Sequence, residues 1–148
     1  MANTAGLCSS FKVDILNGKH AFSAAYRAAD TFNGALYLAS ATLSPSTTVY
    51  SSTGEVANSG TYAAGGSAIT NATAPTNGGG TTAYWTPSGN LTWTSFTASA
   101  FDTLFIYNAT QANSAVGVFT FSSQSVTAGT FTLTMPTNNN STGLIRIA

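Results

Sequence analysis

Apolar and polar residues alternate with a period of two along most of the second half of the chain, as expected of β-strands with one covered face. The clearest case is residues 129–135, where Phe131, Leu133 and Met135 point to one side and threonines to the other. Residues 101–121 hold two strongly apolar runs around a polar segment, which predicts a buried β-hairpin. The chain is therefore expected to be organised around this hairpin.

Within the hairpin, residues 103–107 are almost continuously apolar, a pattern that favours a strand covered on both faces. Residues 108–114 supply turn-forming side chains, and residues 115–121 resume the strand pattern. Turn signals separate further predicted strands, which lie at residues 31–39, 81–86, 91–97, 129–135 and 143–147, with shorter candidates at 47–50 and 68–70. About eight short strands of this kind predict a mainly β protein, an antiparallel β-sandwich or jelly roll.

Only one segment has a helical period. Leu7, Phe11 and Ile15 recur at a spacing of four, which predicts one short N-terminal helix at about residues 9–17. A helix this short is marginal in isolation and is expected to pack on the rest of the protein.

The ends of this helix and the segment after it carry local signals. Ser9 or Ser10 is expected to cap its start, and Asn17-Gly18 to end it. In the connection that follows, Phe22 and Tyr26 are expected to be anchoring side chains.

Length and composition indicate one domain with few charges. The chain has 148 residues, enough for a single core, which we divide into an N-terminal arm with the helix (residues 1–30) and a β-sandwich (residues 31–148). Charged residues make up 5%, against roughly 25% in an average globular protein. The net charge is zero without clustered Lys or Arg, so no nucleic-acid partner is expected. A surface with so little charge is weakly protected from association, which predicts contacts with other subunits and a homo-oligomer, a dimer or trimer.

The N-terminus resembles neither a secretory signal nor a membrane anchor. It lacks a basic segment followed by an apolar one, and no apolar run approaches the roughly 20 residues of a membrane helix. The single cysteine, Cys8, excludes an intrachain disulfide. These features predict a protein that is made in the cytoplasm and has no membrane partner, as is typical of a virion component released by lysis.

Few residues could carry catalysis. His20 is the only histidine, and a nucleophilic triad would need it together with Asp14, Asp30 or Asp102. A glycosidase pair would need two of these carboxylates, or one with Glu55, across a cleft, and nothing in their spacing suggests it. One histidine and one cysteine do not make a zinc site. We therefore predict that the protein is not an enzyme and has no metal or cofactor.

Aromatic residues offer a different kind of site. Tyr84, Trp85 and Trp93 are either sandwich core or a platform for sugar stacking. Tyr84 and Trp85 are adjacent on a predicted strand and cannot face the same way, so one of the two is expected to be exposed and to contact a partner subunit. Together with the apolar face of the helix, the predicted protein interface comprises Leu7, Phe11, Ile15, Tyr84 and Trp85.

Several stretches resemble a family of small structural proteins of tailed bacteriophages and prophages. They are FKVDILNGKH (residues 11–20), FNGALYL (32–38) with the segment 41–56, FDTLFIYNAT (101–110) running to residue 121, and TFTLTMP (130–136) with GLIRIA (143–148). These motifs are structural and include no catalytic signature.

The resemblance implies a virion protein. The reading we favour is a capsid decoration, or cement, protein that binds the outer shell without chemistry, with the major capsid protein as its partner and the capsid surface as its location. A tail or head–tail component is the alternative within the same class. A carbohydrate-binding β-sandwich module used for adhesion is the alternative of a different class.

Overall fold

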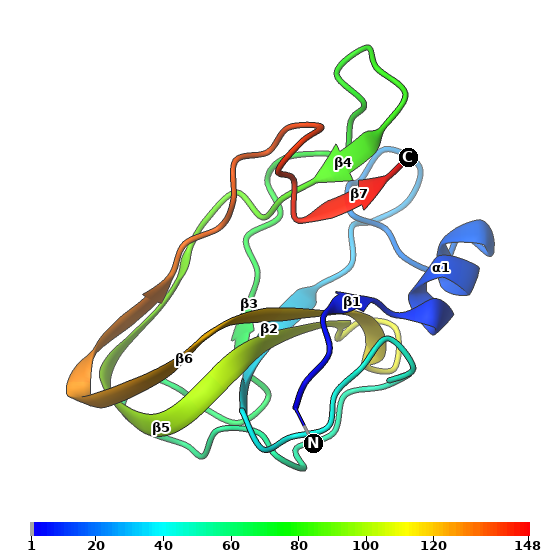
Figure 1. Ribbon diagram of the computed structural model, residues 1–148. Coiled ribbons are helices and arrows are strands. Elements are labelled where there is room, and N and C mark those ends of the chain that lie inside the picture. Colours follow the sequence, from blue (N-terminus) through cyan, green and yellow to red (C-terminus); the bar gives the residue numbers. More distant parts are fainter. Residues whose placement is uncertain (1) are drawn as a thin grey trace.

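The computed structural model describes residues 2–148, and antiparallel β-structure dominates it (Figure 1). The elements in chain order are β1 (Gly6–Leu7), α1 (Ser9–Leu16), β2 (Phe32–Leu38), β3 (Ser67–Ala68), β4 (Ala83–Trp85), β5 (Leu91–Asn108), β6 (Ser114–Leu133) and β7 (Ile145–Ile147). This confirms a mainly β fold with one short N-terminal helix. Its two antiparallel sheets are consistent with the sandwich form of the prediction, and the jelly-roll form stays a prediction.

The large sheet has the strand order β1-β6-β5-β2-β3, and the β5–β6 hairpin is its backbone. Pairing within the hairpin runs from Asn108 opposite Ser114, beside the turn, to Leu91 opposite Leu133 at the open end. Figure 1 shows both strands arching away from β2, which pairs with β5 only from Phe101 onwards. The organising hairpin predicted from residues 101–121 is confirmed, and it is longer than predicted.

The separate strands predicted at residues 91–97 and 129–135 are continuations of β5 and β6. The register between the two strands shifts at several points. Ser95, Ala100 and Ala128 have φ values of 51°, 51° and 47°, in the left-handed region. Such irregularities bend the hairpin while the ladder continues, and they also break the alternation that sequence reading follows.

The small sheet pairs β4 with β7, so the strand predicted at residues 143–147 forms beside residues 83–85. Figure 1 places this sheet near α1, at the side of the molecule opposite the N-terminus. Its Trp85 and Ile145 belong to the same buried cluster as Cys8 and Phe11 of the N-terminal arm. The arm, the large sheet and the small sheet therefore share one core.

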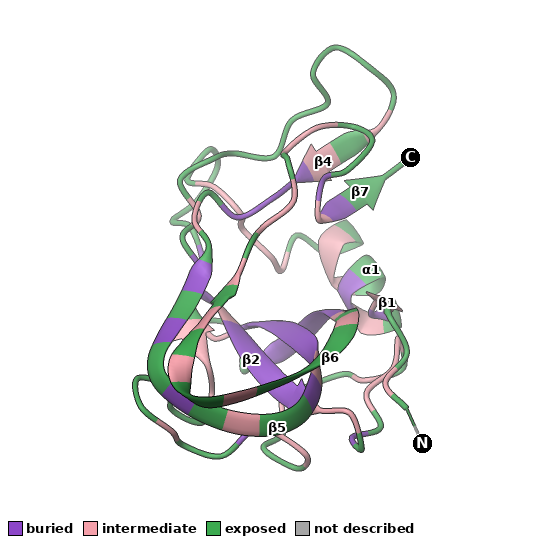
Figure 2. Cartoon of the chain, turned by 60° about the vertical axis from the view of Figure 1, so that its left-hand side comes forward, coloured by how far each residue is buried: buried purple, intermediate pink, exposed green. Residues whose placement is uncertain are grey.

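Burial follows the pairing. Figure 2 shows buried residues along β2 and exposed ones on much of the hairpin beyond it. The strand predicted to be covered on both faces is confirmed, since Thr103 to Tyr107 are all buried. Aromatic packing extends the core toward the open end, where Trp93 stacks on Phe131 at 6.1 Å between ring centroids.

The helix has the predicted position but not the predicted cap. Cys8 occupies the N-cap position without a side-chain hydrogen bond, so neither Ser9 nor Ser10 caps α1. A backbone hydrogen bond satisfies one N–H group at this end of the helix, because the N–H of Ser9 donates to the carbonyl of Pro45 at 2.8 Å. At the other end the stop is as predicted, with Asn17 as C-cap and Gly18 at φ +70°.

The connection after the helix has one anchor, not two. Phe22 packs against the core, stacking on Phe32 at 4.4 Å between ring centroids. The side chain of Tyr26 is fully exposed, so the expectation that it anchors this segment is wrong.

Candidate protein-docking site

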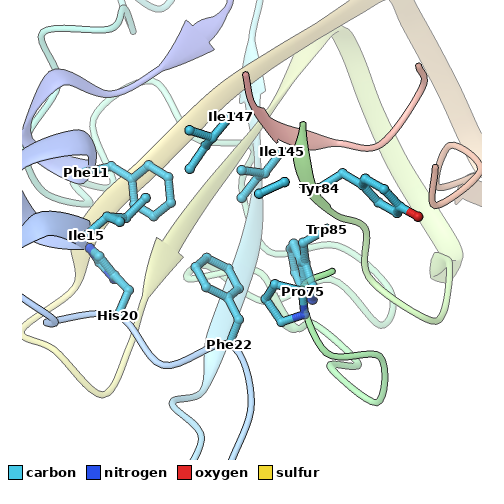
Figure 3. Close-up of a pocket in the computed structure, with 10 residues that line it drawn as sticks. Phe11, Ile15, His20, Phe22, Pro75, Tyr84, Trp85, Ile145 and Ile147 are labelled. Carbon is cyan, nitrogen blue, oxygen red and sulfur yellow. The ribbon is translucent and has the colours of Figure 1, made fainter. Parts of the chain in front are cut away.

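An apolar hollow of about 190 Å³ lies where α1, β4 and β7 meet (Figure 3). Its walls are largely side chains of these three elements: Phe11, Ile15, Ala83, Trp85, Ile145 and Ile147. His20, Phe22, Pro75 and Tyr84 complete the lining. A cavity of about 150 Å³ with such a lining is large enough for a benzene-sized group, so this hollow can take one branched aliphatic or aromatic side chain.

The pairing of β4 with β7 explains why the hollow is apolar. Ala83 lies opposite Ile147 and Trp85 opposite Ile145. Because successive side chains of a strand point to opposite faces, these four share the face turned to the hollow. Tyr84 lies between them on the other face, and Figure 3 shows its ring directed away from the hollow.

Packed aromatic rings hold one wall of the hollow in place. Phe22 lies between Phe32, at 4.4 Å, and Trp85, at 4.8 Å between ring centroids. The Nε1–H of Trp85 donates to Asn71 Oδ1 at 2.9 Å and to the carbonyl of Thr73 at 3.0 Å. The Trp85 ring is therefore fixed by both packing and hydrogen bonds, and the hollow is largely preformed.

His20 is part of this wall and not a free titratable group. Its side chain is fully buried, and Asn108 donates to its Nδ1 at 3.0 Å. The Asn108 amide is oriented by its other partners, which assigns the imidazole proton to Nε2. Nε2 lies 3.4 Å from Asp14 Oδ2, a charge contact longer than an aligned hydrogen bond. Burial lowers the pKa of His20, although Asp14 acts to raise it.

Asp30 joins the connection after α1 to the β5–β6 turn. Its carboxylate accepts from Ala21 N–H at 2.8 Å, from both terminal nitrogens of Arg27, and from Asn108 and Gln111 side chains. Burial would raise the pKa of Asp30, but these donors outweigh it and hold that pKa well below its ordinary value. This carboxylate is a cross-link within the fold.

Glu55 and Asp102 are engaged in the same way. Glu55 accepts from the hydroxyls of Tyr50 at 2.5 Å and Tyr62 at 2.7 Å, and from the Gly65 N–H at 2.8 Å. Asp102 accepts from the Asn3 amide at 2.9 Å and from the Thr103 hydroxyl at 2.7 Å. Glu55 and Asp102 are thus bound to partners of their own, while Asp14 is the carboxylate that the structure brings to His20, and Asp30 shares the Asn108 amide with it.

The five residues predicted to form a protein interface gather around α1 and the small sheet, but they are not equally accessible. Phe11 and Trp85 are buried, while Leu7, Ile15 and Tyr84 are half-buried. Four of the five line the hollow, and Leu7 lies beside it, against Phe11 and Ile15. Of the adjacent pair, Tyr84 is the more accessible residue but is only half-buried, so the expectation that one of the two is exposed is met only in part.

The predicted interface does not include the most exposed apolar side chains of α1 and β7. Leu16, Val13 and Ile147 are 88%, 57% and 47% exposed. Leu16 was visible only as an apolar neighbour of Ile15, and Ile147 as the end of an alternating strand. Their exposure depends on how α1 and β7 sit in the fold, which local periodicity does not encode.

The two tryptophans do not form a surface platform. Trp85 is 2% exposed and Trp93 1% exposed. The indole N–H of Trp93 donates to the Ser67 hydroxyl at 2.9 Å, inside the structure. A sugar could therefore not stack on either ring in this conformation.

Residues 2–148 contain no group of three or more His, Cys, Asp or Glu side chains placed to hold a metal ion. They also contain no helix with the length and apolar character needed to cross a bilayer. Comparison of the chain with models of protein families, with curated proteins and with solved structures finds no match.

Proposed function

We propose that this protein is a structural component of a bacteriophage virion, a capsid decoration protein that binds the outer shell through non-covalent contacts with the major capsid protein. The observation that carries the proposal is the apolar surface of α1 and β7, where the exposed Leu16 and Ile147 line a groove next to the largely preformed hollow. Soluble monomers seldom leave large apolar side chains together on the surface, and such patches mark protein contacts.

The low charge of the chain supports the same function. With 5% charged residues and zero net charge, the surface repels a neighbouring copy weakly. Decoration by many copies needs only modest affinity per contact, because each copy that bridges two shell subunits gains from the second contact. The phage-like motifs of the sequence are consistent with this proposal.

A homo-oligomer is part of the proposal. β6 has β5 on one edge and β1 on the other. The pairing with β1 covers only Gly117 and Val118 of β6. In the described residues no strand pairs with that edge of β6 from Thr120 to Leu133. The segment 121–133 contains neither proline nor a charged residue, the two usual blocks to edge pairing. An edge of this kind supports pairing between copies, as a dimer or a trimer.

Fractionation of a phage-producing culture tests the proposal. Particles purified by density gradient should carry the protein at a copy number comparable to that of the major shell protein. A few copies per particle would instead favour the tail or head–tail alternative. Complete recovery of the protein in the particle-free fraction would refute a virion role.

A further inference from the structure

A groove of about 420 Å³ lies next to the hollow, beside α1 and β7. The groove shares Phe11, Ile15 and Ile147 with the hollow and adds Leu16 and Lys12 along its sides. Hollow and groove are therefore neighbouring depressions that have these three side chains in common. We call the two together the α1–β7 groove.

Charge at the α1–β7 groove differs from charge elsewhere on the molecule. Of the four basic residues, Lys19 pairs with Asp14 at 3.1 Å and Arg27 with Asp30 at 2.7 Å. Lys12 and Arg146 form no ion pair within residues 2–148, and both line this groove. Arg146 donates only to a neutral group, the carbonyl of Ser141, at 2.7 Å.

The acidic residues cannot neutralise these two cations. Asp14 and Asp30 are held in the pairs just described, Glu55 binds tyrosine hydroxyls, and Asp102 binds Asn3 and Thr103. A chain with zero net charge thus places both of its unpaired cations at one apolar groove. The complementary ligand has aliphatic side chains for the groove and carboxylates for its rim.

We propose that the α1–β7 groove binds a peptide segment of a partner protein in which aliphatic residues are interspersed with acidic ones. One aliphatic side chain fills the hollow between Phe11 and Ile147, the next packs on Leu16, and an acidic residue pairs with Lys12. This inference deepens the proposed function and rests on it for the source of the segment, a shell subunit.

The test is an NMR titration of the ¹⁵N-labelled full chain with a short synthetic peptide in which leucines alternate with aspartates. The other probes are a peptide in which leucines alternate with lysines, and anionic phospholipid vesicles. Shift changes should be confined to α1 and β7 and appear with the acidic peptide. Binding of the lysine peptide with equal affinity, or of vesicles but not the acidic peptide, would overturn the proposal.

Matched variants distinguish binding in the groove from non-specific hydrophobic binding. Ile147→Gln removes a groove side chain that is 47% exposed, and Val49→Gln removes one that is 48% exposed elsewhere. Leu16→Gln and Ile147→Gln should each weaken binding by roughly tenfold, and Val49→Gln by less than about twofold. Lys12→Glu should weaken binding of the acidic peptide by roughly fivefold and strengthen binding of the lysine peptide. Equal effects of Ile147→Gln and Val49→Gln would refute the groove as the site.

The same variants distinguish this inference from the proposed function. If particles retain wild-type amounts of Leu16→Gln, the groove is not the docking site although the protein is still a virion component. If the titration succeeds but the wild-type protein does not co-sediment with particles, the groove stands and the virion role fails.

Discussion

Replacing Asp30 by asparagine should destabilise the fold by about 3 kcal/mol, because one buried carboxylate joins the connection after α1 to the β5–β6 turn. The Asp30 side chain is 1% exposed and accepts hydrogen bonds from Ala21, Arg27, Asn108 and Gln111. Asparagine keeps the shape and one acceptor oxygen but turns an NH₂ group toward donors that then have no partner. Hydrogen bonds to a charged group contribute about 1.5–3 kcal/mol each and are not additive.

Only part of that interaction energy is lost. The Arg27 side chain is 39% exposed, so its guanidinium regains water when the carboxylate is removed, and its share must be discounted. The loss therefore comes mainly from the buried donors, the Ala21 N–H and the Asn108 amide. In a domain of this size it corresponds to a fall in Tm of roughly 6–12 °C.

Urea unfolding followed by tryptophan fluorescence measures the effect, with Lys19→Gln as the control. Lys19 belongs to the partly exposed pair with Asp14, so its replacement should cost only about 0.5 kcal/mol. The pH dependence adds a second readout. Because the pKa of folded Asp30 lies below its ordinary value, its stabilisation is present above about pH 4 and is lost as pH falls further. The difference between wild type and Asp30→Asn should shrink in that range. A loss for Asp30→Asn no larger than that for Lys19→Gln would refute the cross-linking role.

Three further predictions concern Gly66, His20 and Cys8. Gly66→Ala should lower the free energy of unfolding by about 3 kcal/mol or more, because at φ +72° the new Cβ would lie 1.9 Å from the carbonyl oxygen of Gly34. The control is Gly79→Ala, at φ +84° in open space, which should lower it by only about 1 kcal/mol in the same unfolding assay. Burial lowers the pKa of His20, so protonation favours the unfolded state and stability should decline as pH falls below about 6.5; a His20→Gln variant with an unchanged slope of unfolding free energy between pH 7 and 5 would contradict this. Burial raises the pKa of Cys8 to about 11, so iodoacetamide at pH 8 should label the native thiol roughly a hundredfold more slowly than the urea-unfolded one, and equal rates would show that the thiol is accessible.

The β-fold could be predicted because its three main strands, β2, β5 and β6, are long enough to show their period. Residues 103–107 lie in the middle of the sheet, with β2 on one side and β6 on the other, and their continuous apolar pattern reports that burial. The union of residues 91–97 with 103–107 in one strand could not be predicted. It depends on alanine and serine at positive φ, which are unfavourable residues for that conformation and therefore give no local signal.

The candidate site was predictable in part. The four-residue spacing placed Phe11 and Ile15 on one helical face, and they do lie side by side in the hollow. The same spacing could not say that Phe11 is core while Leu16 is exposed, because α1 carries apolar residues on more than one side. The opposite wall comes from Ile145 and Ile147, about 130 positions away, through a β4–β7 pairing that no local pattern specifies.

A cryo-electron microscopy map of the phage particle tests the central claim most directly. The account predicts density for this fold repeated across the capsid lattice, with α1 and β7 facing the shell and an acidic, aliphatic segment of the major capsid protein in the α1–β7 groove. Density confined to a single ring or to the tail tip, or a lattice of copies with α1 and β7 turned to solvent, would contradict it.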